Sequence, residues 1–379
     1  MKKLCFIVCS ILIFSFPLCA SAEEVSLPEE FDDFAEAIPD DVAELLPDGF
    51  LSGDFSEPSE AVNEASSPGF LLGTAWRLLC GGIGSAIGTF GVLVGLLILS
   101  GLLHTVAEGS VGGLKNGISF AIGVATATAA VGLQLPRITA AGDFFSRLAI
   151  LMNSLIPVMG VLYISGGNTM GAAVSSASLL LQINLIELGT TALVIPSVSV
   201  CMALTLADSL RGSSPRFSGI TASVKRTLAF VYGLCSTLLT ASLSAQSVLA
   251  SAGDSAGARA VKFVAGNMIP VVGGTVGETL RTLAASVKLL RGSVGVAGII
   301  AVALVLLPTL TELFLTRFVY NCAAAVGDLI GCRTEAGLYR EIASLYGYVI
   351  AAAAMASLLC IFSLTLFAVG SVAIGGNMG

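Results

Sequence analysis

Long, nearly uninterrupted apolar runs are the feature that most constrains this chain. A helix needs about twenty mostly apolar residues to cross the hydrocarbon of a bilayer. Six stretches approach or exceed that length, near Trp76–Leu103, Gly117–Leu135, Leu179–Leu206, Leu228–Ala250, Val294–Arg317 and Ile342–Ile374. Runs of this length favour helices over the short alternating strands of a membrane barrel. The sequence therefore predicts an all-α fold, a polytopic transmembrane helical bundle.

The low charge of the chain supports the same class and narrows the functions open to it. Charged residues make up 11% of the sequence, whereas soluble domains carry about 25%. The chain has one histidine and lacks the phosphate-binding P-loop, the serine nucleophile elbow and the zinc-binding His-Glu-x-x-His motif. We therefore predict no enzymatic activity, no metal or other cofactor, and no nucleic-acid partner.

Residues 1–22 have the three parts of an export signal. Two lysines precede the apolar run Leu4–Leu18, and Ala20-Ser21-Ala22 has the small residues of a cleavage site. The apolar run is short for a bilayer span, which favours a cleaved signal over the alternative, an uncleaved first helix. Cleavage places the residues that follow outside the cytoplasm.

Residues 23–68 form an acidic segment, with fifteen acidic residues and no lysine or arginine. Such a composition cannot bury enough apolar surface to offset chain entropy, so we predict a largely disordered exported segment. The alternative is a short amphipathic helix, from Phe31 through Leu46, that docks on another surface. Outside this segment and the signal, sixteen basic and ten acidic residues remain, so the membrane body carries a net positive charge.

Two weaker apolar stretches, Phe145–Ile164 and Val261–Leu280, are each interrupted by a proline, Pro157 and Pro270. Proline removes a backbone donor and disfavours helix at the residue before it. We predict that these stretches are half-helices or re-entrant segments. With them, the number of membrane segments comes to about six to eight.

The same two stretches suggest an internal repeat. LIPVMG at 155–160 resembles MIPVVG at 268–273, and Ile195-Pro196-Ser197 resembles Leu307-Pro308-Thr309 at nearly the same offset. The predicted divisions of the membrane body are N-terminal helices at 69–140, a first repeat at 141–254 and a second repeat at 255–379.

The number of full spans in each repeat sets its orientation. Three spans would invert the second copy, as in many alternating-access transporters, whereas re-entrant proline segments would leave both copies parallel. The basic loop at 208–226 belongs inside by the positive-inside rule. This favours the re-entrant form for the first copy and leaves the overall topology open.

The Gly/Pro-rich stretch around Pro270 contains the first set of candidate site residues. Its glycines permit unusual backbone angles, and irregular backbone at membrane depth is tolerated only against protein or a watery cavity. The predicted pore-lining or substrate-facing residues are Gly266, Asn267, Pro270, Gly273, Gly274 and Glu278. The alternative is a proline-kinked packing helix.

Polar residues inside apolar runs supply the second set. Asn184 and Glu187 are three residues apart and share a helix face. Because an intramembrane carboxylate is costly, Glu187 is a candidate for ion coupling; the alternative is an ion pair with an arginine of a neighbouring helix or of a partner subunit. Glu312 is expected near the end of its span, at the membrane interface.

A glycine stripe in the first span carries a packing signal. Gly84, Gly88, Gly91 and Gly95 recur at helical spacing, and small residues at this spacing let helix backbones approach closely. Packing against another helix of this chain is favoured over packing against a partner.

The stretch KFVAGNMIPVVGG at residues 262–274 resembles a signature of the stage III sporulation protein AE family of endospore-forming bacteria. The layout is similar as well, with an export signal, an exported segment, and a polytopic body whose Gly/Pro break lies late in the chain. The resemblance extends over residues 69–379 and implies a role in endospore formation.

The resemblance also implies an assembly. Family members are permease-like membrane components of the channel-like secretion or feeding complex between mother cell and engulfed forespore, which supports late forespore gene expression. The implied partners are the other stage III sporulation A proteins, including the ATPase and ring-forming subunits, and the forespore-side stage II sporulation protein Q. The resemblance implies no catalytic residues. The residues alone leave an alternative, a free-standing secondary transporter of a small solute or ion.

Overall fold

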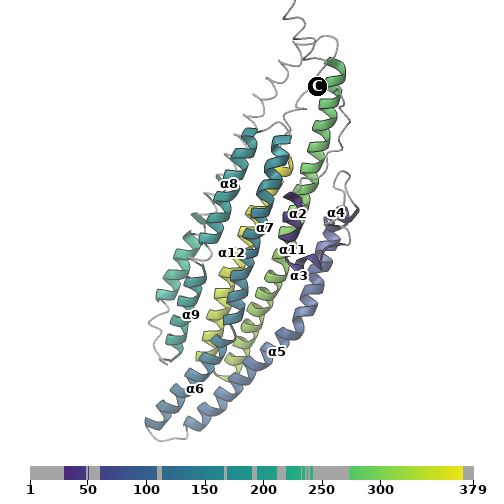
Figure 1. The fold of residues 1–379 in the computed structure, drawn as a ribbon. Helices are drawn as coiled ribbons and strands as arrows, with labels where there is room; N and C mark the ends of the chain where they lie inside the picture. The colour runs from purple at the N-terminus through teal and green to yellow at the C-terminus, as the bar shows by residue number, and fades with distance from the viewer. Residues whose placement is uncertain are drawn as a thin grey trace, which may run out of the picture.

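The computed structural model describes residues 30–47, 50, 60–108, 113–165, 169–189, 194–210, most of 219–241, and 273–369. All regular structure in these residues is helical, so the predicted all-α bundle is confirmed. Figure 1 shows the long helices running side by side in one elongated bundle. The helices are α2 (Glu30–Glu36), α3 (Asp40–Ala43), α4 (Glu60–Ala65), α5 (Pro68–Glu108), α6 (Gly113–Gly132), α7 (Leu135–Ser165), α8 (Thr169–Leu188), α9 (Ile195–Leu210), α11 (Gly273–Ile330) and α12 (Arg333–Val369).

Several of these helices are long and apolar enough to cross a membrane. The described residues contain four such stretches, at Gly69–Val106, Phe120–Ser165, Gly292–Ile330 and Arg333–Ala368, and two shorter apolar helices at Ala172–Leu188 and Ile195–Ala207. With its 58 residues, α11 is about 87 Å long at 1.5 Å per residue. The hydrocarbon layer is only about 30 Å thick, so much of α11 extends beyond any bilayer that it crosses steeply.

Local sequence explains where two of the long helices begin and end. At the start of α5, the Phe70 backbone N–H donates to the Ser67 hydroxyl at 3.1 Å, and Pro68 occupies the first helical position, where its missing N–H costs nothing. At the turn between α11 and α12, Gly331 has φ of 92°. This left-handed conformation favours glycine and ends α11 at Ile330.

The core lies where α11 and α12 pack against each other and against α5 and α7. Glycines allow the close approach. A Cβ built on Gly295 would lie 2.6 Å from the Ala368 Cβ, and one on Gly298 would lie 3.1 Å from Leu155 Cδ1 of α7. A Cβ at Gly295 therefore has no room unless α12 shifts, and one at Gly298 requires the Leu155 side chain to move slightly.

Two of the predicted spans differ from the structure. α7 is a continuous helix with Pro157 inside it, rather than a re-entrant segment, because its Leu151, Leu155 and Val158 side chains are completely buried and outweigh one missing backbone hydrogen bond. The predicted span Leu179–Leu206 is instead divided between α8 and α9.

The division between α8 and α9 bears on the proposed repeat. Pro196 occupies the second position of α9, where proline suits a helix start, whereas Pro308 lies well inside α11. The two prolines that were matched to each other therefore have different structural roles. Pro270, the counterpart of Pro157, lies outside the described residues, so that half of the repeat stays a prediction.

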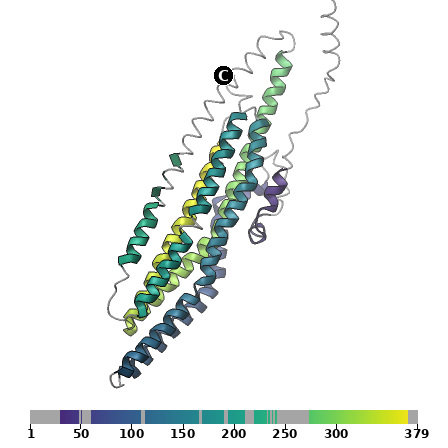
Figure 2. The same cartoon turned by 60° about the vertical axis from the view of Figure 1, so that its left-hand side comes forward.

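Part of the acidic N-terminal segment is folded. Phe31, Phe34, Ile38 and Val42 of this segment are at most 5% exposed, and α2 contacts α7. Arg147 of α7 donates to both carboxylate oxygens of Asp41, at 2.9 and 2.8 Å. In both views α2 and α3 lie on the side of the bundle away from α8 (Figures 1 and 2).

For residues 30–47 the structure has two short helices, α2 and α3, packed on the bundle, which resembles the docked alternative in two pieces; disorder in the rest of the segment stays a prediction. The physical reason is the spacing of the apolar side chains, which lie on one face and bury together while the carboxylates face out. The exposed Asp41–Arg147 ion pair contributes little, since such pairs are worth about 0–1 kcal/mol.

Candidate functional site

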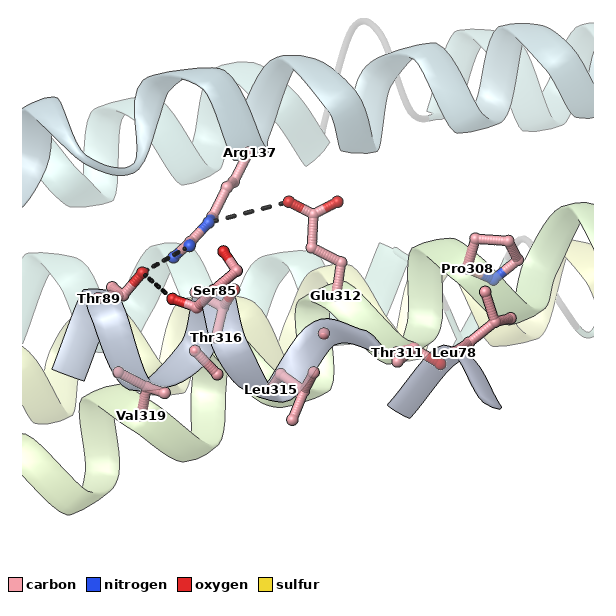
Figure 3. Close-up of a pocket in the computed structure, with 12 residues that line it drawn as sticks. Leu78, Ser85, Thr89, Arg137, Pro308, Thr311, Glu312, Leu315, Thr316 and Val319 are labelled. Atoms are coloured by element: carbon pink, nitrogen blue, oxygen red, sulfur yellow. Dashed lines mark hydrogen bonds and ion pairs between the residues drawn. The ribbon is translucent and has the colours of Figure 1, made fainter. Parts of the chain in front are cut away.

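A pocket of about 270 Å³ opens between α5, α7 and α11. Its lining combines one basic side chain, one acidic side chain, several hydroxyls and apolar walls. The lining residues are Leu78, Gly82, Ser85, Ala86, Thr89, Arg137, Pro308, Thr311, Glu312, Leu315, Thr316 and Val319. We call this recess the Arg137 pocket. Figure 3 shows Arg137 reaching from α7 toward α5, with Glu312 of α11 beside it.

A break between two helices places Arg137 at the pocket. α6 ends at Gly132, and the Gln134 backbone N–H closes a tight turn by donating to Val131 O at 2.8 Å. Pro136 then occupies the second position of α7, where a missing N–H is tolerated. Arg137 is therefore in the first turn of α7, inside the apolar stretch Phe120–Ser165.

The hydrogen bonds of the Arg137 guanidinium are incomplete. Nη2 donates to Thr89 Oγ1 at 3.0 Å, and Thr89 in turn donates to Ser85 O at 3.0 Å. Nε lies 3.8 Å from Glu312 Oε1, which is an ion pair but too long for a hydrogen bond. Nη1 is buried and has no acceptor among the described residues.

Leaving Nη1 of Arg137 without an acceptor costs free energy unless a further group binds to it. The Arg137 side chain is 17% exposed and that of Glu312 is 55% exposed, so the cation is buried more deeply than its counter-ion. A buried donor without an acceptor costs about 1–3 kcal/mol, and more when it is charged. Charged residues within membrane spans are rare and point to function. The described lining offers a guanidinium, a carboxylate and several hydroxyls, which are groups that bind polar and charged ligands.

A buried polar layer lies directly beside the pocket. Gln134 is completely buried; its amide donates to the Tyr320 hydroxyl, and its carbonyl accepts from the Tyr346 hydroxyl. Tyr320 also donates to Ala130 O at 3.1 Å. These bonds tie the α6–α7 junction to both α11 and α12. The helix break that positions Arg137 is thus held by side chains of two other helices.

A second polar cluster joins the end of α5 to the start of α12. Glu335 is 5% exposed and accepts from the Ser100 hydroxyl at 2.6 Å, with His104 Nε2 at 3.4 Å. Cys332 donates to Leu97 O at 3.6 Å. Burial, together with the nearby Glu335 carboxylate, raises the pKa of the Cys332 thiol. These contacts satisfy the buried carboxylate of Glu335 at this end of the bundle, which gives that residue a structural role.

The residues predicted around Pro270 gain no site from the structure. Gly266, Asn267 and Pro270 lie outside the described residues. Gly273, Gly274 and Glu278 belong to the first turns of α11, whose side chains are not among those described. Their pore-lining role stays a prediction.

Asn184 and Glu187 share a face of α8, as predicted, and that face is exposed. The Asn184 amide donates to Leu180 O of its own helix at 2.7 Å. Leu179, Gln182 and Ile183 form the buried face of α8 instead. Ion coupling by Glu187 stays a prediction.

The glycine stripe of α5 has no close neighbour among the described residues. A Cβ built on Gly84, Gly88, Gly91 or Gly95 meets no described atom within 4 Å, and the favoured packing against another helix of this chain stays a prediction. The stripe lies on the far side of α5 from Leu93 and Leu97, which are buried against the bundle. Packing with a partner, the alternative, likewise stays a prediction.

Arg137 was missed in the sequence, and Glu312 was assigned only to an interface. The signal for Arg137 is the run Gln134-Leu135-Pro136-Arg137, in which a polar residue and a proline interrupt an apolar stretch just before a charge. Such a pattern marks a helix break at membrane depth, where charged side chains find partners.

Comparison with known proteins gives one family. The sequence profile described as "Stage III sporulation protein AE" matches residues 64–371. A curated protein of that name from Bacillus subtilis (strain 168) is 25% identical over 213 residues, which cover 56% of this chain and 53% of the relative. The match therefore spans about half the length of that relative. No solved structure matches the chain. Because the profile covers most of the sequence, this all-α chain of apolar helices belongs to the stage III sporulation protein AE family.

Proposed function

We propose that this protein is a membrane subunit of a sporulation-specific channel complex between mother cell and forespore, and that late forespore gene expression requires it. The observation that carries the proposal is the family match over residues 64–371. Within the complex the chain serves as a conduit or a platform, and a separate ATPase energises the assembly. It is not itself an enzyme.

The proposed setting is the mother-cell membrane that surrounds the forespore. The four long apolar stretches support a multi-pass protein, and the predicted export signal supports an acidic segment outside the cytoplasm. The proposed partners are the other stage III sporulation A proteins, including the ATPase and ring-forming subunits, and stage II sporulation protein Q on the forespore side.

The open glycine stripe of α5 supports a partner helix in this assembly. Gly84, Gly88, Gly91 and Gly95 leave a shallow, side-chain-free track on an exposed face. Tracks of small residues let a second helix approach closely in a bilayer. We assign this track to contact with a membrane subunit of the complex.

Deletion of the gene in its own host tests the proposal. Vegetative growth should be normal, whereas development should stall after engulfment and the count of heat-resistant spores should fall by orders of magnitude. A reporter driven by a late forespore promoter should stay silent, and the intact gene should restore both readouts. Normal spore counts in the deletion strain would contradict the proposed role.

Gly88→Leu tests the partner contact on α5. Leucine fits without a clash because no described atom lies within 4 Å of the built Cβ, and it favours the helix by about 1 kcal/mol over glycine. We expect a protein level and a Tm no lower than those of the wild type, with at least a tenfold loss of the other stage III subunits in affinity purification.

Ile87→Leu, at the neighbouring exposed position, is the matched control and should keep the partners. Wild-type recovery of partners by the Gly88→Leu protein would show that the glycine stripe is not an interface, without affecting the outcome of the deletion experiment.

A further inference from the structure

We propose that the Arg137 pocket binds a small zwitterion, with the anionic group of the ligand on Arg137 and its ammonium group on Glu312. The inference rests on the geometry of the pocket and does not depend on the assembly proposed above. It assigns a binding site to two charged residues, one on α7 and one on α11.

The guanidinium supplies the anion-binding half. Nη2 is already engaged by Thr89, whereas Nη1 is buried and has no acceptor among the described residues. A guanidinium presents its donors as a planar fork that suits a carboxylate or a phosphate. An anionic ligand oxygen at Nη1 would complete the coordination that the protein leaves open.

Glu312 supplies the cation-binding half. Its carboxylate is 55% exposed and approaches Arg137 only through the 3.8 Å contact with Nε. Figure 3 shows the carboxylate beside the guanidinium, joined to it by a dashed line. Because this contact exceeds hydrogen-bond length, the carboxylate oxygens can still accept from a ligand ammonium.

Charge balance selects a zwitterion over a simple ion. A free anion on Arg137 would lie close to the like charge of Glu312, and a free cation on Glu312 would lie close to Arg137; both arrangements are repulsive. A neutral apolar molecule would leave the buried Nη1 donor unsatisfied. Among these ligands, one with both charges a few ångströms apart satisfies the two side chains at once.

The size and walls of the recess limit the ligand further. A cavity of about 150 Å³ is known to hold a six-carbon ring, so about 270 Å³ admits roughly ten non-hydrogen atoms. The hydroxyls of Ser85 and Thr311 and the apolar side chain of Leu315 line the same space. This suits a small α-amino acid, or the phosphoethanolamine end of a lipid, which has the same pair of charges.

Thermal unfolding of the purified full chain in detergent tests the site. A thiol-reactive dye reports unfolding because Cys201, Cys332 and Cys360 are buried in the folded protein. The probes are L-alanine and glycerophosphoethanolamine as zwitterions, acetate as an anion and ethylammonium as a cation. We expect a saturable rise in Tm with at least one zwitterion and none with acetate or ethylammonium. The zwitterion that stabilises identifies the source, a free amino acid or a lipid headgroup.

Two variants and a control test whether the ligand-induced stabilisation depends on Arg137 and Glu312. Arg137→Gln and Glu312→Gln should each weaken binding at least about tenfold, the loss expected for one charge-assisted hydrogen bond. Glu312→Gln, at the more exposed position, keeps the test valid if the arginine variant fails to fold. Arg147→Gln, which removes the other ion-paired arginine of α7, should bind like wild type. Stabilisation by acetate equal to that by the zwitterions, or no stabilisation by any probe, would overturn the proposal.

Discussion

Replacing Gly295 with leucine should prevent the folded protein from accumulating. A Cβ at this position would lie 2.6 Å from the Ala368 Cβ and 3.2 Å from its backbone Cα. Real Cβ atoms essentially never approach another heavy atom to 2.6 Å, and this neighbour is the Cβ of an alanine fixed on a helix rather than the far end of a flexible side chain. The substitution therefore forces α11 away from α12 along the pair of helices that forms the core. Overpacking of this kind costs about 1–3 kcal/mol for small insertions and more for large ones.

A graded series sharpens this prediction. Gly295→Ala is the small insertion, so this variant should fold but with a clearly lowered Tm. Gly295→Leu is the large one and should be degraded or aggregate in the membrane fraction. Gly88→Leu makes the same chemical change where no described atom lies within 4 Å of the built Cβ and should not lower Tm. Equal stability of the two leucine variants would show that the α11–α12 contact is not as close as the structure has it.

Replacing Gln134 with leucine should destabilise the chain by about 2–4 kcal/mol. The two side chains have similar volumes, so the cost comes from the lost hydrogen bonds. Without the Gln134 carbonyl, the Tyr346 hydroxyl is left buried with no acceptor, which costs about 1–3 kcal/mol. Tyr320 loses the amide donor but keeps its bond to Ala130 O, so its share is smaller. Unfolding curves of the purified variant in detergent measure the total loss of stability.

A double-mutant cycle with Tyr346→Phe tests whether this bond is the cause. Removing both partners of a buried hydrogen bond leaves no unsatisfied group and costs less than removing one. The double variant should therefore be more stable than the sum of the single losses predicts, with a coupling of about 0.5–3 kcal/mol. Simple additivity would indicate that the two side chains do not interact, and that the α6–α7 junction is held in another way.

The apolar runs by themselves determined that this chain is a helical membrane protein. Burying backbone in lipid leaves helices as the only form for such runs, so the class follows without any knowledge of how the helices meet. Local chemistry set some boundaries as well. Ser67 and Pro68 start α5, and Gly331 separates α11 from α12, because caps and left-handed turns depend only on residues near in sequence.

The Gln134–Tyr346 bond and the Arg137–Glu312 pair could not be predicted from the sequence. The members of each pair lie far apart in the chain and meet only through the packing of α7 against α11 and α12. The structural effect of a proline likewise depends on the residues that surround it. Pro157 is carried inside a packed helix while Pro196 begins one, and the difference lies in how much apolar surface the surrounding helix buries.

The glycines show most directly what only the tertiary structure decided. Their spacing correctly indicated that Gly88 and its companions share one face of α5, because helical periodicity fixes the side of a helix on which a residue lies. It could not indicate which helix, if any, lies opposite that face. The chain instead uses Gly295 and Gly298 for close approach, since closeness is a property of two helices together, and the sequence of each helix describes only its own surface.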